Sequence, residues 1–392
     1  MFIMRDRFGI KPLFYSVTND RVYFSSEINS LKLISEIDLN PSIQSISDFT
    51  MLSYIPAPNT FYKGIFSLEP AEIIYLQLSE NGISKNHDFH YKININPDLD
   101  LSYDESTEHT SFLIDKAVKN QLKSDVPLGA LLSGGIDSSL VSESSNRYLN
   151  GDLNTFSVGF SDNAYDESHE AKLIAQSIGT NHNQILTKSQ HFSFNEVKEL
   201  LLHCGQPYGD SSIFAVNMIS KLMKEQIKVA LSGDGGDESF GGYEFYRKLK
   251  ILGLIKNISG IHYFYKKLKK YKNMTDDELL LNQFVWMSQK EYQELFLVEG
   301  KDSAIRFFDK SNYINYFDDL NWSEKIIARA TDMNFRLLLP NDFLFKVDMG
   351  SMKEGMEIRV PLLDEELVNF AHKIPSKHKV GIKTTKKILR KI

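Results

Sequence analysis

The chain has 392 residues, 42% of them hydrophobic and 24% charged, which is enough for about two domains that each bury a core. Its net charge of −6 and sequence pI near 6.0 argue against non-specific nucleic-acid binding as the main activity. One cysteine excludes a disulfide framework, and no long apolar run or leading signal segment is present, so a cytoplasmic protein without membrane or nucleic-acid partners is expected.

The first 90 residues have the pattern of a β-rich domain. Apolar and polar side chains alternate in short bursts such as PLFYS, RVYFSS and EIIYLQL, and one helix is predicted near Ser26–Ser35. Residues 91–102, YKININPDLDLS, contain Asn, Asp and Pro at positions typical of a linker. The chain therefore divides into a sheet-rich part, a linker and residues 103–392.

Residues 103–231 alternate between helix and strand patterns, beginning with a helix from Tyr103 to about Lys123. Strands are expected near residues 128–132, 155–160, 183–187 and 228–231, and helices near residues 138–148, 168–178, 195–203 and 213–226. Such alternation predicts a parallel sheet with helices on both faces and a ligand crevice at the carboxyl ends of its strands. Beyond Tyr243 the pattern is mainly helical, with few strand signals.

The segment Leu131–Ser139, LLSGGIDSS, lies where the first of these strands turns into a helix. Gly134 and Gly135 permit a close backbone approach, and the unpaired amides of the first helical turn favour an anion. Asp137 would repel that anion unless a divalent cation bridges them, so a phosphate and magnesium site is predicted. The segment matches neither a G-x-x-x-x-G-K-[ST] loop nor a G-x-G-x-x-G turn, and an ordinary strand-to-helix turn remains an alternative.

A second loop, Val229–Tyr243, follows the strand near residues 228–231. Its sequence, VALSGDGGDESFGGY, places Asp234, Asp237 and Glu238 close together. Packed carboxylates repel one another, so a bound cation or a role in proton transfer is expected here, with a plain glycine-rich turn as the alternative. Both acid-rich loops are expected at the same edge of the sheet.

With these two loops, the chain resembles the glutamine-hydrolysing asparagine synthetases. Further segments occur in that family's order: FSVGF, YDE, GTNH, QPYGDSS, KVDMGSM, EIRVPLLD and KKILR. The resemblance implies an α/β fold of the ATP-pyrophosphatase type (adenine nucleotide alpha hydrolase-like), a parallel sheet with helices on both faces. It implies the domains 1–90, a β-rich remnant of an Ntn-type glutaminase domain, 91–102, the linker, and 103–392, the synthetase domain with its following helical region.

The N-terminal part resembles the end of the family's glutaminase domain in MRDRFGIKPLFY, FSSEI and PAPNTFYKGIFSLEPAE. Asp6 matches a position that contacts glutamine in the family, but residue 2 is Phe where the family exposes a nucleophilic cysteine. Cys204 is expected to be a small buried residue and not a nucleophile. Glutaminase activity is therefore expected to be lost, and the chain to be clipped at both ends, with Lys391 and Ile392 inside an apparent helix.

The resemblance implies a ligase that amidates aspartate through β-aspartyl-AMP, consuming ATP and releasing AMP and pyrophosphate, with ATP and Mg2+ as cofactors and ammonia as the nitrogen donor. Asp137 and Asp237 match the family's magnesium carboxylates. Lys386 matches a lysine on the phosphates, although Lys383 and Lys387 are close enough for the register to differ by a turn. The other matched positions are the pyrophosphate cradle, Ser133, Gly134, Gly135, Ser138 and Ser139, and the adenosine and α-phosphate site, Leu131, Val158, Ser232 and Gly233.

A base is required near the acyl carbon to remove a proton from the ammonia adduct. Asp234 occupies the position where many family members have a glutamate, so its reach is one methylene shorter. Glu238 is expected to orient Asp234 or to bind substrate, and these two residues with Lys386 are the expected catalytic set. Arg359 and Asp364 have two alternatives, substrate contact or a structural role as an ion pair or helix cap.

The motifs that bind ATP do not identify the carboxylate acceptor. A sugar uronic acid in surface-polysaccharide synthesis is an alternative to aspartate, and an inactive nucleotide-binding fragment is another. A tRNA-modifying ATP pyrophosphatase is disfavoured because a basic face and extra cysteines are lacking, and the basic runs at residues 266–272 and 383–391 are expected to be solvated helix faces. The candidate protein partners are a separate glutaminase and a second copy of the chain in a homodimer.

Overall fold

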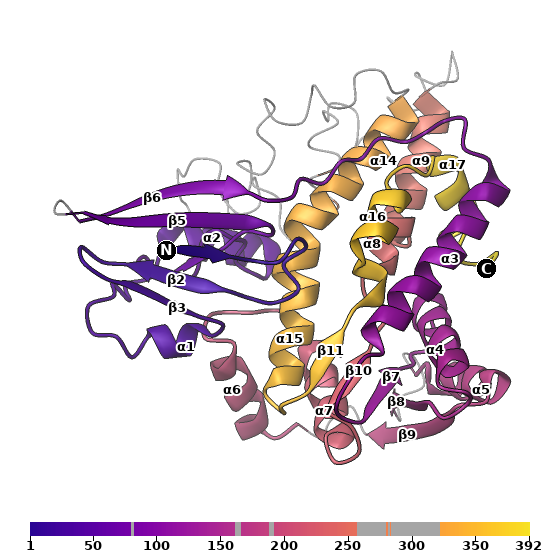
Figure 1. Cartoon of the computed structure of the whole chain (residues 1–392), viewed down its shortest axis with the longest axis horizontal. Coiled ribbons are helices and arrows are strands. Elements are labelled where there is room, and N and C mark those ends of the chain that lie inside the picture. The colour runs from indigo at the N-terminus through magenta and orange to yellow at the C-terminus, as the bar shows by residue number, and fades with distance from the viewer. Residues whose placement is uncertain (80–81, 161–165, 188–191, 257–279, 281–282, 284–321) are drawn as a thin grey trace. The chain divides into compact units, whose positions relative to one another are not determined.

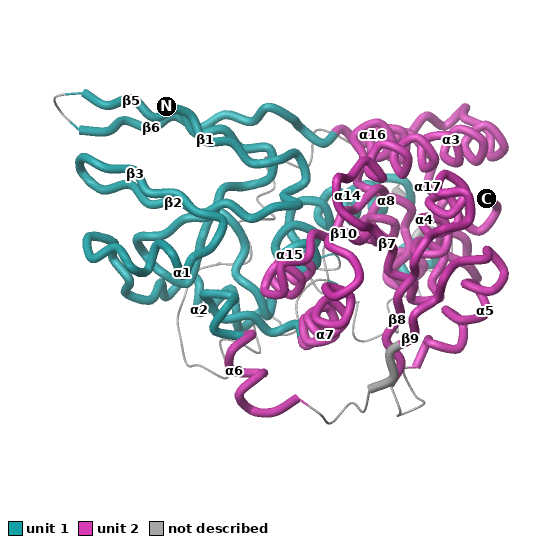
Figure 2. The backbone as a smooth tube through the Cα atoms, turned by 60° about the horizontal axis from the view of Figure 1, so that its bottom comes forward, with its two compact units in different colours: residues 1–93, 201–210, 248–345 teal, residues 94–200, 211–247, 346–392 magenta. Residues whose placement is uncertain are grey.

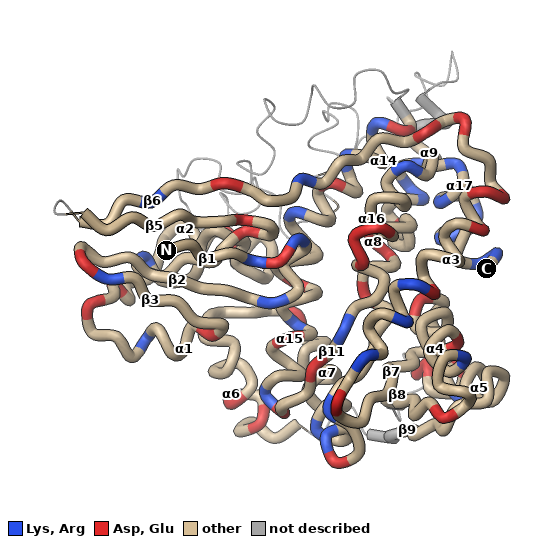
Figure 3. The backbone as a smooth tube through the Cα atoms, in the orientation of Figure 1, with Lys and Arg blue, Asp and Glu red and all other residues tan. Residues whose placement is uncertain are grey.

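The computed structural model (Figure 1) describes residues 1–79, 82–160, 166–187, 192–256, 280, 283 and 322–392. They form two compact units (Figure 2): residues 1–93, 201–210 and 248–345, and residues 94–200, 211–247 and 346–392. Acidic and basic residues are interspersed along the elements of each unit (Figure 3). None of the described helices combines the length and apolarity that a membrane span requires. The basic run at residues 266–272 and Tyr165 of the YDE segment lie outside the described residues.

Two antiparallel sheets of three strands form the first unit. One has the order β1 (Phe2–Met4), β5 (Glu72–Ser79) and β6 (Gly82–Phe89), and the other the order β3 (Val22–Ser25), β2 (Phe14–Val17) and β4 (Phe66–Ser67). Ile3 of β1, Tyr15 of β2 and Ile74 of β5 belong to one buried cluster, so side chains of both sheets share a core. The period-two pattern of EIIYLQL is confirmed as far as Leu76, because Ile74 and Leu76 are buried while Tyr75 between them is exposed, but Leu78 at its end is 71% exposed.

Among the described residues, the helices that lie wholly in the first unit are α1 (Ile28–Leu31), α2 (Ile43–Leu52), α14 (Trp322–Met333) and the π-helix η2 (Asn334–Phe343). The helix expected near Ser26–Ser35 is thus a single turn. Pro340 lies inside η2, where its missing N–H cannot join a regular helical ladder. The adjacent Asn341 donates its side-chain amide to Leu337 O at 2.7 Å, which satisfies a carbonyl of this irregular stretch.

A five-stranded parallel sheet forms the centre of the second unit. Its order is β11 (Glu357–Arg359), β10 (Val229–Leu231), β7 (Leu128–Leu131), β8 (Asn154–Phe160) and β9 (Asn181–Thr187). The other elements along this part of the chain are α3 (Tyr103–Gln121), α4 (Ile136–Tyr148), α5 (Ser168–Ile178), α6 (Phe194–His203), α7 (Ile213–Met223), α8 (Gly236–Phe240), α9 (Glu244–Lys256), α15 (Leu344–Met352), η3 (Pro361–Leu363), α16 (Glu365–Ala371) and α17 (Ser376–Lys379). The expected alternation of strands and helices through residue 231 is confirmed.

Helices cover both faces of this sheet, as expected. Successive residues of a strand point to opposite faces. Ala130 and Leu231 accordingly join a buried cluster with residues of α3, α4 and α16, whereas their neighbours Leu131 and Ala230 pack in a second cluster with Ile219 of α7. The sheet therefore has a core on each side, which is the architecture that the near-continuous apolar strands predict.

In the C-terminal third the structure adds one strand that the sequence did not specify, and the helix expected at the end of the chain is wrong. Glu357–Arg359 forms β11, which pairs in parallel with β10, although three residues are too few to show a strand period in the sequence. Beyond α17 the chain makes turns and no helix, and Lys386 has a φ of 50°, which an α-helix does not allow. The apparent helix at the end of the chain is one turn, closed by a hydrogen bond from Arg390 N to Lys386 O at 3.0 Å.

Arg359 and Asp364 have structural roles in this fold. Arg359 Nη1 donates to the carbonyls of Gln121, the last residue of α3, and of Lys123 just beyond it, both at 2.7 Å. Asp364 is the N-cap of α16 and accepts from the amides of Glu366 and Leu367. These contacts favour the structural alternatives for both residues.

We expect Asp364→Ala to lower the free energy of unfolding by about 1 kcal/mol, because two amides of the first turn of α16 lose their acceptor. Urea titration followed by circular dichroism measures the change. Asp364→Asn is the matched control, since its side-chain oxygen can still cap the helix. A substrate contact, and not a cap, would be indicated if Asp364→Asn kept full stability and lost activity.

Candidate active site

The two acid-rich loops leave the sheet from neighbouring strands. β8 and β9 extend the sheet on one side of β7, while β10 and β11 extend it on the other, so the strand order reverses between β7 and β10. Leu231 at the end of β10 lies opposite Ala130 of β7. Ligands of open parallel sheets bind outside the carboxyl ends of the strands at such a reversal. The expectation that the loops after β7 and β10 lie at the same edge of the sheet is therefore confirmed.

The first loop holds its shape through glycine and serine. Gly134 has a φ of 86°, and a Cβ there would lie 2.8 Å from Glu170 Cβ. The Ser133 amide donates to Ser138 Oγ at 3.2 Å, and Ser139 Oγ donates to Gly135 O at 2.7 Å. Gly135, the N-cap of α4, has no side chain to occupy the amides of the first turn, so these amides face the loop with the positive end of the helix dipole behind them.

The second loop touches the first at positions where only glycine fits. A Cβ on Gly233 would lie 2.6 Å from Ser138 N, and a Cβ on Gly236 would lie 2.5 Å from Asp137 Cγ. Within the second loop, Ser232 Oγ donates to Asp234 Oδ2 at 2.6 Å. The structure thus brings the expected phosphate residues and the expected carboxylates into one site.

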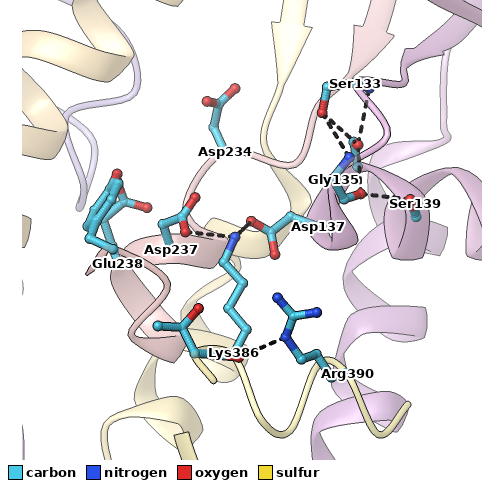
Figure 4. A network of polar contacts seen from close by, with 12 residues as sticks. Ser133, Gly135, Asp137, Ser139, Asp234, Asp237, Glu238, Lys386 and Arg390 are labelled. Atoms are coloured by element: carbon cyan, nitrogen blue, oxygen red, sulfur yellow. Dashed lines mark hydrogen bonds and ion pairs between the residues drawn. The ribbon is translucent and has the colours of Figure 1, made fainter. Parts of the chain in front are cut away.

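Lys386 joins the two loops (Figure 4). Its Nζ lies 2.7 Å from Asp237 Oδ1 and donates to Asp137 Oδ2, so one ammonium group bridges a carboxylate from each loop. Lys387 is directed elsewhere, because its Nζ donates to Lys377 O at 2.8 Å and lies 5.4 Å from the ring centre of Tyr103. The sequence left open which lysine enters the site, and the turn after α17 selects Lys386.

Burial perturbs the acids of this site. Desolvation raises the pKa of Asp137 to about 6, with a further upward contribution from Asp237 and an opposing one from Lys386. Desolvation lowers the pKa of Lys386, but the two carboxylates outweigh it and the net shift is upward. Glu238 is 2% exposed, and burial raises its pKa to about 7 although Tyr243 Oη donates to it at 2.5 Å.

The cluster is short of positive charge. Lys386 supplies one cation for Asp137 and Asp237, with Asp234 and Glu238 nearby. Asp137 Oδ1 is buried and accepts no hydrogen bond from any residue that the structure describes. A buried carboxylate oxygen without a donor is costly, and Mg2+ prefers such oxygen ligands. Asp137 and Asp237 therefore suit a magnesium ion that arrives with phosphate.

The residues expected at adenosine are also brought together. Leu131 of β7 and Val158 of β8 are partly buried and pack against one apolar cluster with Phe156. Ser232 is buried at the end of β10, and Gly233 follows it against α4. An apolar surface thus adjoins the glycine loop, as a site for a base and its phosphates requires.

Asp6 and Cys204 lie in the first unit, outside this site. Asp6 accepts from the amides of Phe8, Ile10 and Lys11 at 2.8 to 3.2 Å, so its carboxylate stabilises a turn. The expectation for Cys204 is confirmed, because the residue is 2% exposed and burial raises the pKa of its thiol to about 12.

Gly242 and Tyr243 were not singled out from the sequence. A Cβ on Gly242 would overlap Asp237 Oδ1 and Lys386 Cε, so this position must be glycine for the ion pair to form. Tyr243 holds Glu238. The segment FGGY directly after the carboxylates was the available sequence signal. The requirement for glycine at position 242 depends on Lys386, which is distant in the sequence.

Residues 110–392 match the family model for asparagine synthase, and residues 1–90 match that for a glutamine amidotransferase domain. The chain is 29% identical over 402 residues to asparagine synthetase (glutamine-hydrolyzing) 1 of Bacillus subtilis, covering 99% of this chain and 62% of that protein. It is 31% identical over 374 residues to "Putative asparagine synthetase (glutamine-hydrolyzing) 2" of Methanocaldococcus jannaschii, covering 90% of this chain and 69% of that protein.

The chain therefore spans 62% and 69% of the lengths of these two relatives. Among solved structures, the NH3-dependent NAD synthetase of Campylobacter jejuni is 14% identical with a TM-score of 0.25, and the match covers 55% of this chain and 96% of that one. A similarity this low does not bear on the fold or the site.

We expect Gly242→Ala to weaken the binding of magnesium pyrophosphate at least about tenfold, because the methyl group would separate Asp237 from Lys386 and disturb a charge-assisted pair. Isothermal titration calorimetry measures the affinity. Gly151→Ala is the control, since Gly151 has a φ of 87° and no atom within 4 Å of its added Cβ. It should lose stability and keep pyrophosphate affinity. Equal affinities for Gly242→Ala and the wild type would contradict the steric argument.

The raised pKa of Asp137 predicts a dependence of stability on pH. The folded state favours protonated Asp137. The contribution of this protonation to the free energy of unfolding is therefore full below the ordinary pKa of 3.8, and it is lost as the pH rises through about 6. Relative to Asp137→Asn, which cannot ionise, the wild type should lose about 1 kcal/mol between pH 5 and pH 7. Denaturant titrations of both proteins at each pH test this, and a difference that stays constant or grows with pH would refute it.

Proposed function

Because this chain belongs to the asparagine synthase family, we propose that it catalyses ATP-dependent amidation of a carboxylate, with aspartate as the acceptor and β-aspartyl-AMP as the intermediate. The observation that supports this most directly is the placement of Lys386 between Asp137 and Asp237. These groups lie beside a glycine loop at the amino end of α4, where a chain of ATP phosphates would find amides, a cation and metal-binding carboxylates together.

In this proposal the loop after β7 holds the phosphates. Backbone amides at Gly134, Gly135 and the first turn of α4 bind the pyrophosphate end of ATP, while the hydroxyls of Ser133, Ser138 and Ser139 keep the loop in shape. Leu131, Val158, Ser232 and Gly233 contact adenosine and the α-phosphate. Asp137 and Asp237 hold magnesium, which when bound offsets phosphate charge.

The first chemical step joins the acceptor to AMP. An oxygen of the aspartate β-carboxylate attacks the α-phosphorus, a new P–O bond forms, and the bond to pyrophosphate breaks. Both reactants are anionic, so Lys386 stabilises the transition state by donating to phosphate oxygens as negative charge gathers on the leaving group. The ion pairs with Asp137 and Asp237 hold its ammonium group in place before the reaction.

The second step replaces AMP with ammonia. Ammonia attacks the acyl carbon, and Asp234 takes a proton from the nitrogen as the bond to AMP breaks. The hydrogen bond from Ser232 to Asp234 Oδ2 fixes this carboxylate and leaves Oδ1 for the proton. Glu238 is buried and bonded to Tyr243, so we assign it to positioning of α8 and Asp234.

The proposed nitrogen source for these 392 residues by themselves is ammonia. Their one thiol, Cys204, is buried with a raised pKa, so it supplies no nucleophile for glutamine hydrolysis. We propose residues 1–90 as the glutaminase-type part, with Asp6 as its glutamine-contacting position, residues 91–102 as the linker, and residues 103–392 as the synthetase part. A separate glutaminase would be the partner that delivers ammonia from glutamine.

The proposal is tested by pyrophosphate release from MgATP. We expect release that requires both aspartate and ammonium and that glutamine does not support. Lys386→Met should lower the rate by about 100-fold, because a donor to the developing charge is lost. Lys383→Met is the matched control, since it removes the same charge from an exposed side chain in the same segment, and its rate should be unchanged.

Other outcomes would redirect or refute the proposal. If pyrophosphate release required a sugar uronic acid in place of aspartate, the proposed ATP chemistry would stand and the proposed acceptor would be wrong. Absence of ATP binding would identify an inactive fragment. An unaltered rate in Lys386→Met would remove the assigned role of the bridging lysine.

A further inference from the structure

We propose that Arg390 is a phosphate-binding residue that holds the pyrophosphate end of ATP and remains on pyrophosphate after AMP is transferred. This rests on the proposed function and adds a residue to its phosphate site. None of the motifs singled out in the sequence assigned a role to this arginine, which ends KKILR.

The turn that carries Lys386 also places Arg390. The Arg390 amide donates to Lys386 O at 3.0 Å, so this hydrogen bond closes one turn of chain between the two residues. Lys386 is paired with Asp137 and Asp237, and the bond between the backbones of Arg390 and Lys386 holds Arg390 one turn away from these pairs. Figure 4 shows the guanidinium group of Arg390 beside the Lys386 side chain and extending toward Asp137.

Unlike the other arginines of the second unit, Arg390 has no carboxylate partner among the residues that the structure describes. Arg147 pairs with Asp115, Arg247 with Glu244, and Arg359 with Glu357. Arg390 donates through Nε to Thr385 O at 3.0 Å, and its two terminal amino groups contact no hydrogen-bond or ion-pair partner among the described residues. The one bond orients the guanidinium plane and leaves its outer edge available.

The groups around the Arg390 guanidinium favour a bound anion. The Arg390 guanidinium extends toward Asp137 in the first turn of α4 (Figure 4), and a cation directed at the positive end of a helix dipole is unfavourable unless a negative group lies between them. Asp137, in the first turn of α4, has one oxygen directed to Lys386, while its buried Oδ1 has no donor within the described residues. A pyrophosphate group with its magnesium ion satisfies the guanidinium, the amides and this oxygen together.

Arginine suits this role better than a second lysine. Its planar fork can donate two parallel hydrogen bonds to phosphate oxygens, whereas lysine acts as a point charge. Lys386, whose side chain is 13% exposed, would donate to phosphate oxygens during the transfer, and exposed Arg390 would hold the outer phosphate of the leaving pyrophosphate. Arg390 therefore contacts the terminal phosphates and not the AMP half of ATP.

Binding of inorganic pyrophosphate and of AMP, each with magnesium and measured by calorimetry on the full chain, tests the proposal without any acceptor. We expect Arg390→Gln to weaken pyrophosphate binding by about 10- to 100-fold and to leave AMP binding within about twofold, because only pyrophosphate meets the lost charge-assisted bonds. Arg390→Lys should fall between wild type and Arg390→Gln, since it keeps charge without the fork.

Lys391→Gln is the matched control, because it removes one positive charge from the next exposed residue. It should leave both affinities unchanged. Equal pyrophosphate affinities for Arg390→Gln and Lys391→Gln would overturn the assignment, as would an equal loss of pyrophosphate and AMP binding with a lowered melting temperature. A wild-type chain that binds neither ligand would refute the proposed function itself, and the assignment with it.

Discussion

The bridge that Lys386 makes between Asp137 and Asp237 is the interaction on which the candidate active site depends. It joins three segments, the loop after β7, the loop after β10 and the turn after α17, and its ends at Asp137 and Lys386 are 249 residues apart. The Lys386 side chain is 13% exposed, so its ammonium group is largely desolvated and its charge is favourable only when it is paired. Formation of the site and folding of the C-terminal turn are therefore linked.

Close approach of the two loops is possible because glycine occupies the contact points. Gly233 and Gly236 face the amino end of α4 and the Asp137 carboxylate, and Gly242 faces the ion pair itself. Because these three glycines have no side chain, atoms of the first loop and of Lys386 can occupy the positions where a Cβ would lie. This packing gives a physical reason for a glycine-rich sequence that composition alone would assign to a surface turn.

The same packing makes the site electrostatically costly. Burial raises the pKa values of Asp137 and Glu238, to about 6 and about 7, so both acids are held less ionised than free side chains would be. Lys386 also has left-handed backbone geometry, with a φ of 50°. Functional sites often retain such strain because their ligand repays it, and a magnesium-bound polyphosphate would supply both the cation and the anion that this site favours.

The sequence by itself determined the parallel sheet, the two loops at its edge and the burial of Cys204, because strand periods, glycine turns and small apolar residues act over a few neighbouring positions. It did not determine β11, whose three residues become a strand only by pairing with β10. The sequence also did not decide which of Lys383, Lys386 and Lys387 enters the site. It did not distinguish Glu238, which is bonded to Tyr243, from Asp237, which is more exposed and pairs with Lys386. Those outcomes depend on contacts between residues far apart in the chain, whose distances and burial exist only once the tertiary structure has formed.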